Sequence, residues 1–507
     1  MTLRQVLERS RSVPLLWGLY FVLKLGLHAA GFIQLAAGWD LLLLAVLVLR
    51  PSSKLPRIFC DVVSVVAAAW LFWYESLLPP MDEAVPFLLD PQLRPSRQYV
   101  LRFLKGLAGP WVVIGALGLG LAAAATRKVR VHWTPAVAAA LLVVLFVVRR
   151  PDGSRLTAEV ERFYAEESSR RVPVRAGGAD FDVVFVHVCS LSWEDLRAVG
   201  LDSHPFLARF DILFDRFNTV TSYSDPGSIR LLRAFCGQTR HEALYKDAPA
   251  ECYVMDRLQA AGYRTFTAFN HDGRYQGMAG KVVKYGKAGP VMDVSDLTLE
   301  RLNFNGAPIY GDYETLAKWW RLRQRTGGRR AALYYDTVSL HTGAHPATRK
   351  DWWKEEAPKR YRRSVEGLFS EIERFASLVE SSGRDCVIFF VPEHGMALSG
   401  SRLLAPGLRD LPLPSTTVVP AGVRIISGKT RPSTHRRVTE PSSYLALGTL
   451  LSSYLAHLPF KGGEALQELP ATRFVGENRR MIVLESGGDL YLWWMNKKWV
   501  RLPSRCR

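Results

Sequence analysis

A lone cysteine directly follows a strongly apolar segment in the sequence "DFDVVFVHVCSLSWEDL". The run Val183 to Val188 is rich in β-branched residues, which is typical of a central parallel strand. Cys189 comes next, and ligands in open α/β sheets collect at the carboxyl ends of strands. A cysteine in this place is either a small buried hydrophobic residue or a functional thiol at a ligand-binding site. This segment alone leaves both interpretations open.

Further polar groups follow two other predicted strands. "FFVPEHGMAL" places Glu393 and His394 at the end of one, and two adjacent polar side chains at a strand end need not both serve packing. "YYDTVSLHTGAHP" places His341 and His345 after the other. Because a single histidine is commonly a structural residue, neither histidine alone identifies a site.

A serine stands directly ahead of a predicted helix in "TSYSDPGSIRLLRAF". Ser224 can be an N-cap, a position that serine often fills, with Pro226 in the first turn where proline is favoured. The same position also suits phosphate binding, because backbone NH groups and the helix dipole attract an anion there.

Cysteine, glutamate and histidine together form a reasonable ligand set for zinc, which takes four ligands in tetrahedral geometry. A serine oxygen in the fourth place would lose its proton to the metal and become a nucleophile. We therefore expect Cys189, Glu393 and His394 to hold Zn²⁺ beside Ser224.

The segments that carry these residues alternate between strand and helix patterns from Phe181 onward, which indicates a doubly wound α/β domain. The expected helices lie at Ile229 to Phe235, Val254 to Ala261, Thr315 to Arg325 and Tyr361 to Ser381. The expected strands are Val183 to Val188, Thr265 to Phe269, Ala331 to Tyr335, Cys386 to Val391 and Gly422 to Ile426. The tail "MIVLESGGDLYLWWMNKKWVRL" predicts a small antiparallel hairpin unit.

The first 150 residues are much more apolar than the rest, so the 507-residue chain is predicted to be a multi-domain protein with an N-terminal transmembrane domain of five helices. No cleavage site follows the first apolar stretch, which we therefore interpret as an anchor. The stretches run from Val13 to Ala37, Trp39 to Leu49, Ile58 to Leu78, Gly106 to Ala125 and Pro135 to Val148.

Three clusters of Arg and Lys flank these stretches, and such residues mark cytoplasmic loops. All three are cytoplasmic only if the amino terminus is inside, and five spans then place everything after Val148 outside. Arg149 and Arg150 oppose this rule. The predicted domains are thus a transmembrane domain at 1–150, a linker at 151–178 that contains a short amphipathic helix around Leu156 to Glu167, and an external domain at 179–507.

The formal net charge of +19 comes partly from these loops, and no nucleic-acid-binding motif accompanies it. We therefore expect its counterpart to be an anionic membrane surface rather than a nucleic acid.

Lys24 and Asp61 fall inside predicted spans, where an ionisable group is costly. A contact between them would join the first and third helices.

Among the six cysteines, Cys236 and Cys252 bracket a polar connection and are the candidate disulfide pair in an oxidising compartment.

Several segments resemble the family of cellulose phosphoethanolamine transferases encoded beside bacterial cellulose synthase. In order and spacing these are "VCSLSWED", "TSYSDPGSIRLLRAFCGQT", "HDGRYQG", "LHTGAHP", "VPEHGMAL" and "GLRDLPLPS". The resemblance also covers the apolar amino-terminal region and the "EPSSYLAL" helix. The cysteine at the end of the first strand separates this family from other alkaline-phosphatase-like proteins, including lipid A phosphoethanolamine transferases, which have a carboxylate there.

The resemblance implies a protein of the bacterial inner membrane with an alkaline-phosphatase-like, sulfatase-type catalytic domain in the periplasm. It implies one zinc ion bound by Cys189, Glu393, His394 and the nucleophile Ser224, and a disulfide between Cys236 and Cys252. It also implies working roles for Tyr223, His341 and Arg409, and we add His271 and His345 as candidates for substrate contacts.

Two residues depart from the family pattern. Asp225 replaces a glycine after the nucleophile, where it could favour the helix amino terminus or repel a phosphodiester; the intact helix pattern behind it favours the first effect. Met396 replaces a small residue after "EHG" and is expected to narrow one wall of the site.

The expected activity is transfer of phosphoethanolamine from phosphatidylethanolamine to glucose C6 hydroxyls of cellulose, through a phospho-serine and next to the cellulose synthase complex. One alternative is a sulfatase-like or glycerophosphate-transferring relative with another donor or acceptor. The other is a membrane scaffold subunit of the synthase complex without catalysis.

Overall fold

A computed structural model describes residues 13–29, 33–51, 53–76, 132–146, 152–174, 180–348, 354–401, 406–427, 435–457, 459–460, 468–494 and 499–502. The chain forms two compact units. The first contains residues up to 151 apart from 94–96, and the second contains residues from 152 onward.

The described part of the first unit consists of apolar helices packed around a core that includes Phe21, Leu44, Leu71 and Leu141. These helices are α2 (Leu15–Ala29), α3 (Ala37–Leu49), α4 (Lys54–Glu75) and α8 (Thr134–Phe146). Among the described residues, α4 is the one helix both long and apolar enough to cross a membrane. The stretch predicted at Gly106 to Ala125 lies outside the described residues, so the five-span arrangement stays a prediction.

The predicted contact between Lys24 and Asp61 is wrong. Lys24 is fully buried and pairs with Asp40 of α3 and, at 2.6 Å, with Glu75 at the end of α4. Asp61 instead lies 3.4 Å from Arg50, which directly follows α3. The reason is that Asp61 lies in the N-terminal half of α4, whereas Lys24 contacts the C-terminal end of that helix, where Glu75 lies. The buried ions join three helices, which is a structural role.

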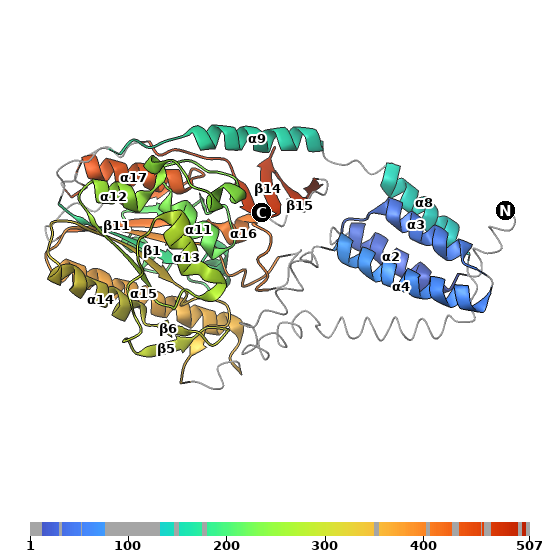
Figure 1. Ribbon diagram of the computed structural model, residues 1–507, viewed down its shortest axis with the longest axis horizontal. Helices are drawn as coiled ribbons and strands as arrows, with labels where there is room; N and C mark the ends of the chain where they lie inside the picture. The colour runs from blue at the N-terminus through green and yellow to red at the C-terminus, as the bar shows by residue number, and fades with distance from the viewer. Residues whose placement is uncertain are drawn as a thin grey trace. The chain divides into compact units, whose positions relative to one another are not determined.

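A seven-stranded sheet forms the centre of the second unit (Figure 1). Its order is β12-β2-β11-β9-β1-β7-β4, and β1 lies between β9 and β7 with parallel pairing on both sides. Every residue of β1 is buried, as expected of a strand covered on both faces. The bounds are β1 Asp182–Val188, β2 Ile212–Phe214, β4 Arg264–Phe269, β7 Ala331–Thr337, β9 Cys386–Pro392, β11 Gly422–Ile426 and β12 Arg436–Val438.

Helices cover both faces of this sheet through two separate apolar cores, which confirms the predicted α/β layers (Figure 1). All five strands expected from the sequence belong to the sheet, although β11 pairs antiparallel with β9. One core includes residues of α11 (Ser224–Leu232), α12 (Val254–Ala260), α13 (Met278–Gly286) and α17 (Tyr444–Ala456). The other includes residues of α10 (Trp193–Ala198), α14 (Asp312–Arg325) and α15 (Ala357–Ser381).

A second, antiparallel sheet near the carboxyl end has the order β13-β14-β15-β16. The expected hairpin turns at Gly487 and Gly488, which both adopt positive φ. Leu156 and Val160 of α9 pack against this sheet, so the amphipathic helix expected within the linker is present and belongs to the second unit. The bounds are α9 Gly153–Ser169, β13 Val475–Asn478, β14 Met481–Ser486, β15 Asp489–Trp494 and β16 Val500–Arg501.

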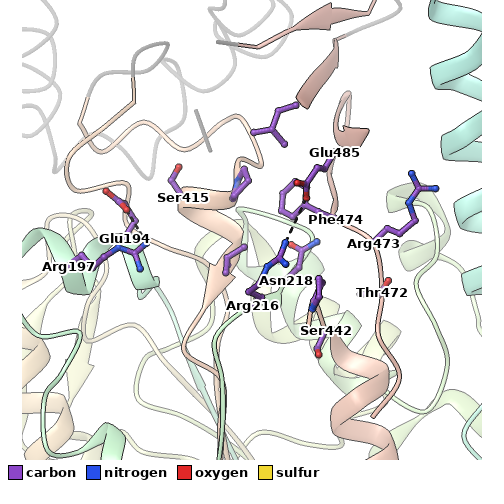
Figure 2. A pocket seen from close by; sticks show the side chains of 14 residues that line it. Glu194, Arg197, Arg216, Asn218, Ser415, Ser442, Thr472, Arg473, Phe474 and Glu485 are labelled. Atoms are coloured by element: carbon purple, nitrogen blue, oxygen red, sulfur yellow. Dashed lines mark hydrogen bonds and ion pairs between the residues drawn. The ribbon is translucent and has the colours of Figure 1, made fainter. Parts of the chain in front are cut away.

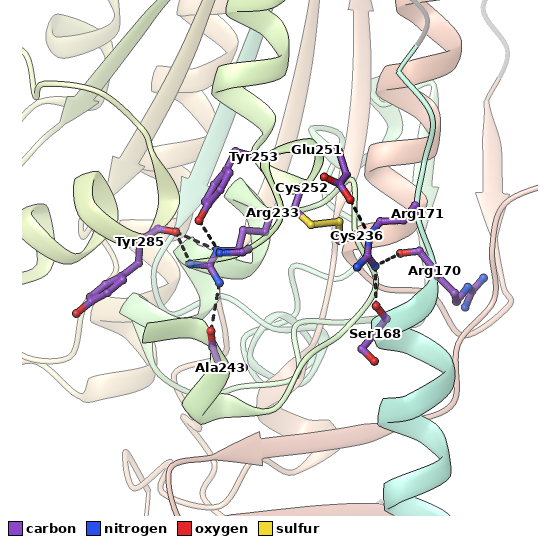
Figure 3. Close-up of a disulfide and its surroundings, with 11 residues drawn as sticks. Ser168, Arg170, Arg171, Arg233, Cys236, Ala243, Glu251, Cys252, Tyr253 and Tyr285 are labelled. Carbon is purple, nitrogen blue, oxygen red and sulfur yellow. Dashed lines mark hydrogen bonds and ion pairs between the residues drawn. A yellow bond between two sulfur atoms is a disulfide. The ribbon is translucent and has the colours of Figure 1, made fainter. Parts of the chain in front are cut away.

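Cys236 and Cys252 form the predicted disulfide (Figure 3). Cys236 follows the end of α11 and pairs through a β-bridge with Arg171, which lies 3.5 Å from Glu251. Beside the disulfide, Arg233 donates to the carbonyl oxygens of Tyr285 and Lys246. The bond therefore closes a loop held by buried arginine contacts.

Replacing both disulfide cysteines by serine is expected to lower the free energy of unfolding of the second unit by about 3 kcal/mol. The reason is the lost restraint on a loop with a sequence separation of 16. Denaturant unfolding of the double variant, compared with reduced and oxidised wild type, measures this effect. Equal unfolding midpoints for the variant and oxidised wild type would contradict the expectation.

Candidate active site

Cys189 lies at the carboxyl end of β1, inside a tight turn. Its NH donates to Thr337 O at 2.9 Å, which extends the pairing with β7 by one residue. Ser190 then adopts φ +66°, a conformation that L-residues other than Asn and Asp seldom enter. The hydroxyl of Tyr361 donates to Ser190 O at 2.7 Å and holds this turn from α15. The chain thereby reverses directly after the thiol.

Glu393 and His394 follow β9, the parallel neighbour of β1, so they reach the same edge of the sheet. Glu393 N donates to Val188 O at 2.8 Å, and Leu191 N donates to His394 O at 2.7 Å. The two strand ends are thus joined by backbone hydrogen bonds on both sides of the cysteine.

The next turn requires a glycine. A Cβ on Gly395 would lie 2.5 Å from Ser192 Oγ and 2.7 Å from Asp195 Oδ2. These two residues form the capping box of α10, and the Asp195 carboxylate also accepts from Met396 N at 2.6 Å and Leu398 N at 2.9 Å. Met396 is buried in the core near α10. The "LSWED" segment therefore fixes the turn that carries the Glu-His pair.

Ser224 is the first residue of α11, and Tyr223 occupies the N-cap position, so the serine does not cap the helix. Its Oγ lies 3.7 Å from Cys189 Sγ and 3.5 Å from His394 Nε2. Cys189 Sγ lies 3.8 Å from the same ring nitrogen. Side chains from three separate segments of the sequence converge here.

These distances fit a tetrahedral metal site. Ligand atoms about 2.0–2.3 Å from a tetrahedral zinc ion lie roughly 3.3–3.8 Å apart. The three distances above fall in this range, as does the 3.4 Å between His394 Nε2 and Glu393 Oε2. Both Glu393 oxygens are buried without a hydrogen-bond partner among the described residues, which is costly for a carboxylate that binds no cation. The four residues fit zinc.

The ring of His394 is oriented for metal binding. Its Nδ1 lies 2.9 Å from Gly395 O, so Nδ1 carries the proton and Nε2 presents its lone pair to Cys189 and Ser224. Burial lowers the pKa of His394 well below its usual value, and the positive charge of Arg409 adds to this. The ring is therefore neutral, as a metal ligand must be.

The two anionic ligands resist ionisation when no cation is bound. Burial, followed by the charge of Glu393, raises the pKa of the Cys189 thiol well above its ordinary value. Burial and the charge of Asp336 raise the pKa of Glu393 in the same direction. A divalent cation reverses both effects because it stabilises the thiolate and the carboxylate.

A histidine that the sequence interpretation missed lies behind Glu393. His187 Nδ1 is 3.6 Å from Glu393 Oε1 and 3.2 Å from Asp336 Oδ2, and the Tyr334 hydroxyl lies 3.0 Å away. Although burial opposes it, hydrogen bonds from His187 and His271 lower the pKa of Asp336. His187 precedes Cys189 by two residues on β1, so the strand period of two could have placed both on one face.

Replacing His187 by glutamine is expected to weaken zinc binding roughly 10- to 100-fold, because groups that orient metal ligands contribute affinity of this size. Competition with a chromogenic chelator measures the dissociation constant. His204→Gln, on a half-buried histidine outside this cluster, is the control. Equal zinc affinity in both variants would show that His187 does not support Glu393.

Arg409 and His341 lie near the cluster. Arg409 Nη1 donates to Ser190 Oγ at 3.3 Å, next to the cysteine. His341 follows β7, stacks on Phe304 and holds Thr342 O with Nδ1 at 3.0 Å, so Nε2 is its unprotonated nitrogen. Burial and the nearby charge of Arg409 lower the pKa of His341 to about 3.

The remaining predicted residues occupy different places. The Tyr223 hydroxyl donates to Asp410 at 2.7 Å rather than to Ser224. His271 Nε2 lies 3.2 Å from Asp336 Oδ1, which puts it behind the site. His345 lies in the small strand β8 (His345–Pro346), with Nδ1 2.9 Å from Gly343 O, and the structure does not bring it into the four-residue cluster.

Asp225 lies in the first turn of α11, where a negative charge is favourable. Its Oδ2 accepts from the Tyr245 hydroxyl at 2.8 Å and from Lys281 Nζ at 2.9 Å. Lys281 thus balances the charge that the family pattern lacks.

A pocket of about 320 Å³ lies elsewhere, where the C-terminal sheet meets α16 (Pro414–Thr417) (Figure 2). Arg216, Phe474 and Glu485 line it, and none of the predicted site residues does. The pocket is therefore distinct from the candidate site.

Two family models match the chain. The "Cellulose biosynthesis protein BcsG C-terminal domain" matches residues 147–499, and the corresponding N-terminal domain matches residues 17–142. The cellulose biosynthesis protein BcsG of Escherichia coli K12 is 34% identical over 369 residues, and that of Salmonella typhimurium LT2 is 35% identical over 366. Each match covers 70% of this chain and 64% of the relative, so the chain matches less than two thirds of their length.

Solved structures with a similar arrangement include a Vibrio parahaemolyticus protein of the alkaline phosphatase superfamily. It is 15% identical with a TM-score of 0.49, over 68% of this chain and 87% of that one. Lipooligosaccharide phosphoethanolamine transferase A of Neisseria meningitidis is 16% identical with a TM-score of 0.42, over 86% and 95%. At these scores neither likeness bears on the activity.

Proposed function

The chain belongs to the family of the cellulose biosynthesis protein BcsG, and from this premise we propose that it transfers phosphoethanolamine from phosphatidylethanolamine to glucose C6 hydroxyls of nascent cellulose. The observation that carries the proposal is the convergence of Cys189, Ser224, Glu393 and His394. These residues would hold one zinc ion, which when bound acidifies the serine hydroxyl and offsets negative charge.

Ser224 is the nucleophile of a two-step transfer. Its oxygen loses its proton and forms a bond to phosphorus while the bond from phosphorus to the diacylglycerol oxygen breaks; the proton passes to the departing diacylglycerol oxygen, and phosphoethanolamine stays on the serine. In the second step the C6 hydroxyl of glucose gives its proton to His341 and its oxygen bonds to phosphorus, while the serine oxygen leaves and takes that proton back. The position of Ser224 at the amino terminus of α11 supports this role, since the helix dipole attracts the phosphate.

Arg409 offers a planar pair of donors to the non-bridging phosphate oxygens. Its hydrogen bond to Ser190 holds the guanidinium next to Cys189 and so beside Ser224. Phosphoryl transfer depends mainly on such positioning and charge neutralisation.

His341 enters the reaction as a neutral ring, because its pKa of about 3 lies far below neutral pH. A neutral imidazole with Nδ1 bonded to Thr342 O presents Nε2 as an acceptor. We therefore assign His341 to accept the proton of the incoming sugar hydroxyl, in preference to donating one as an imidazolium to the leaving diacylglycerol. Tyr223 holds the Asp410 side chain beside Arg409, which is its proposed contribution.

The apolar first unit would keep the site close to its lipid donor. A phospholipid lies in the membrane, so anchoring the catalytic unit there raises the local concentration of the donor. Its location in the bacterial inner membrane with a periplasmic catalytic unit, and its place beside the cellulose synthase complex, are parts of the same proposal.

The test uses the full chain in vesicles that contain phosphatidylethanolamine. Release of diacylglycerol that depends on added cello-oligosaccharide, with phosphoethanolamine on the sugar, is the expected result. Diacylglycerol release without any dependence on the sugar would instead indicate a hydrolase. Release from phosphatidylglycerol alone would indicate another donor, and no release with intact synthase assembly would indicate a scaffold.

A further inference from the structure

The end of β13, in the C-terminal sheet, contacts the segment Val220 to Tyr223. This segment directly precedes Ser224 and is called the nucleophile loop. Glu477 N donates to Val220 O at 2.6 Å, and the Glu477 carboxylate accepts from the Tyr164 hydroxyl at 2.7 Å and His241 N at 2.8 Å. Val220 adopts φ +68°, which is an outlier for a β-branched residue. Such strain persists where the surroundings over-determine the backbone, and it clusters at functional sites.

Asn478, the last residue of β13, is buried and uses its full hydrogen-bonding capacity. Its Oδ1 accepts from Thr221 Oγ1 at 2.9 Å and from Ser222 N at 3.2 Å. Its Nδ2 donates to Ser222 Oγ at 2.9 Å and to Asp410 O at 2.7 Å. One amide group therefore binds the nucleophile loop and the loop of Arg409 at the same time.

The two loops also contact each other beside this amide. Ser222 Oγ donates to Arg409 O at 2.5 Å, and the Tyr223 hydroxyl donates to Asp410. Ser222 precedes Ser224 by two residues, and Asp410 directly follows Arg409. The hydrogen bonds of Asn478 therefore join the two segments that carry the groups proposed to act on phosphate.

We propose that Asn478 is a positioning residue that fixes Ser224 relative to Arg409, which makes the C-terminal sheet a working part of the transferase site. This inference rests on the proposed function. Asn478 makes no hydrogen bond to any of the four zinc-binding residues, so its effect on activity is separable from metal binding.

The test replaces Asn478 by alanine in the full chain. Transfer is expected to fall roughly 10- to 100-fold, because small displacements of reacting groups have effects of this order. Bound zinc per chain stays as in wild type. Gln238→Ala is the matched control: Gln238 is also a buried amide, but its side chain bonds to Arg230 of α11 and to Ser443 rather than to the loops that Asn478 joins. The control is expected to retain transfer.

A double-mutant cycle with Arg409→Ala separates positioning from general destabilisation. If Asn478 sets the distance between Ser224 and Arg409, its replacement has less than about a threefold effect once the guanidinium is absent. A merely structural residue would lower activity by the same factor in both backgrounds. Equal factors, or equal activities of Asn478→Ala and Gln238→Ala, would overturn the proposal.

Mass detection of Ser224 that carries phosphoethanolamine distinguishes this failure from failure of the proposed function. Wild type that forms no such adduct from phosphatidylethanolamine would refute the function itself. Wild type that forms it, together with an Asn478→Ala variant that forms it at the wild-type rate, would refute the positioning role alone.

Discussion

Ser224→Ala is expected to abolish phospho-enzyme formation and to reduce phosphoethanolamine transfer by a factor on the order of 10⁴ or more. The alanine methyl group has no oxygen to bond to phosphorus, and both steps of the transfer pass through that oxygen. The fold should stay intact, because the serine side chain caps no helix and its contacts are limited to the cluster.

Ser377→Ala is the control for this variant, since Ser377 lies exposed on α15. Transfer is measured with labelled phosphatidylethanolamine, and circular dichroism reports the fold. Undiminished transfer by a pure, folded Ser224→Ala protein would refute the nucleophile assignment.

Cys189→Ser is expected to lose zinc at a chelator concentration that wild type withstands, and to lose transfer with it. The variant replaces a thiolate by a hydroxyl, a much weaker zinc ligand, in a fully buried place. The decrease in affinity should exceed the roughly 10- to 100-fold decrease expected for a residue that only orients a ligand, such as His187.

Zinc per chain is measured by elemental analysis after dialysis against chelator. Cys386→Ser is the matched control, because Cys386 is also a buried free cysteine but opens a strand away from the site. If both serine variants hold zinc equally well, Cys189 is not a ligand.

The strand ends were the most predictable part of the site. Parallel strands of one sheet end at a common edge, so Cys189 and the Glu393-His394 pair could be assigned to that edge from apolar runs alone. Their contact was less predictable, because it depends on β9 lying next to β1, a pairing between segments about 200 positions apart.

The partner of Lys24 was predicted wrongly because helical periodicity does not give the axial register between two helices. The true partners, Asp40 and Glu75, lie at the ends of their apolar stretches. Asn478 carried no signal at all, since a polar residue in a hairpin is ordinary. Its significance depends on tertiary contacts with Thr221, Ser222 and Asp410.

The contacts of β13 have a consequence for biogenesis. Every proposed zinc ligand precedes Asn478 in the chain, so a ribosome has already made the metal site when it reaches the segment that aligns Arg409. By the positioning proposal, a polypeptide truncated before β13 keeps all four proposed zinc-binding residues but lacks the amide that joins the Ser224 and Arg409 segments.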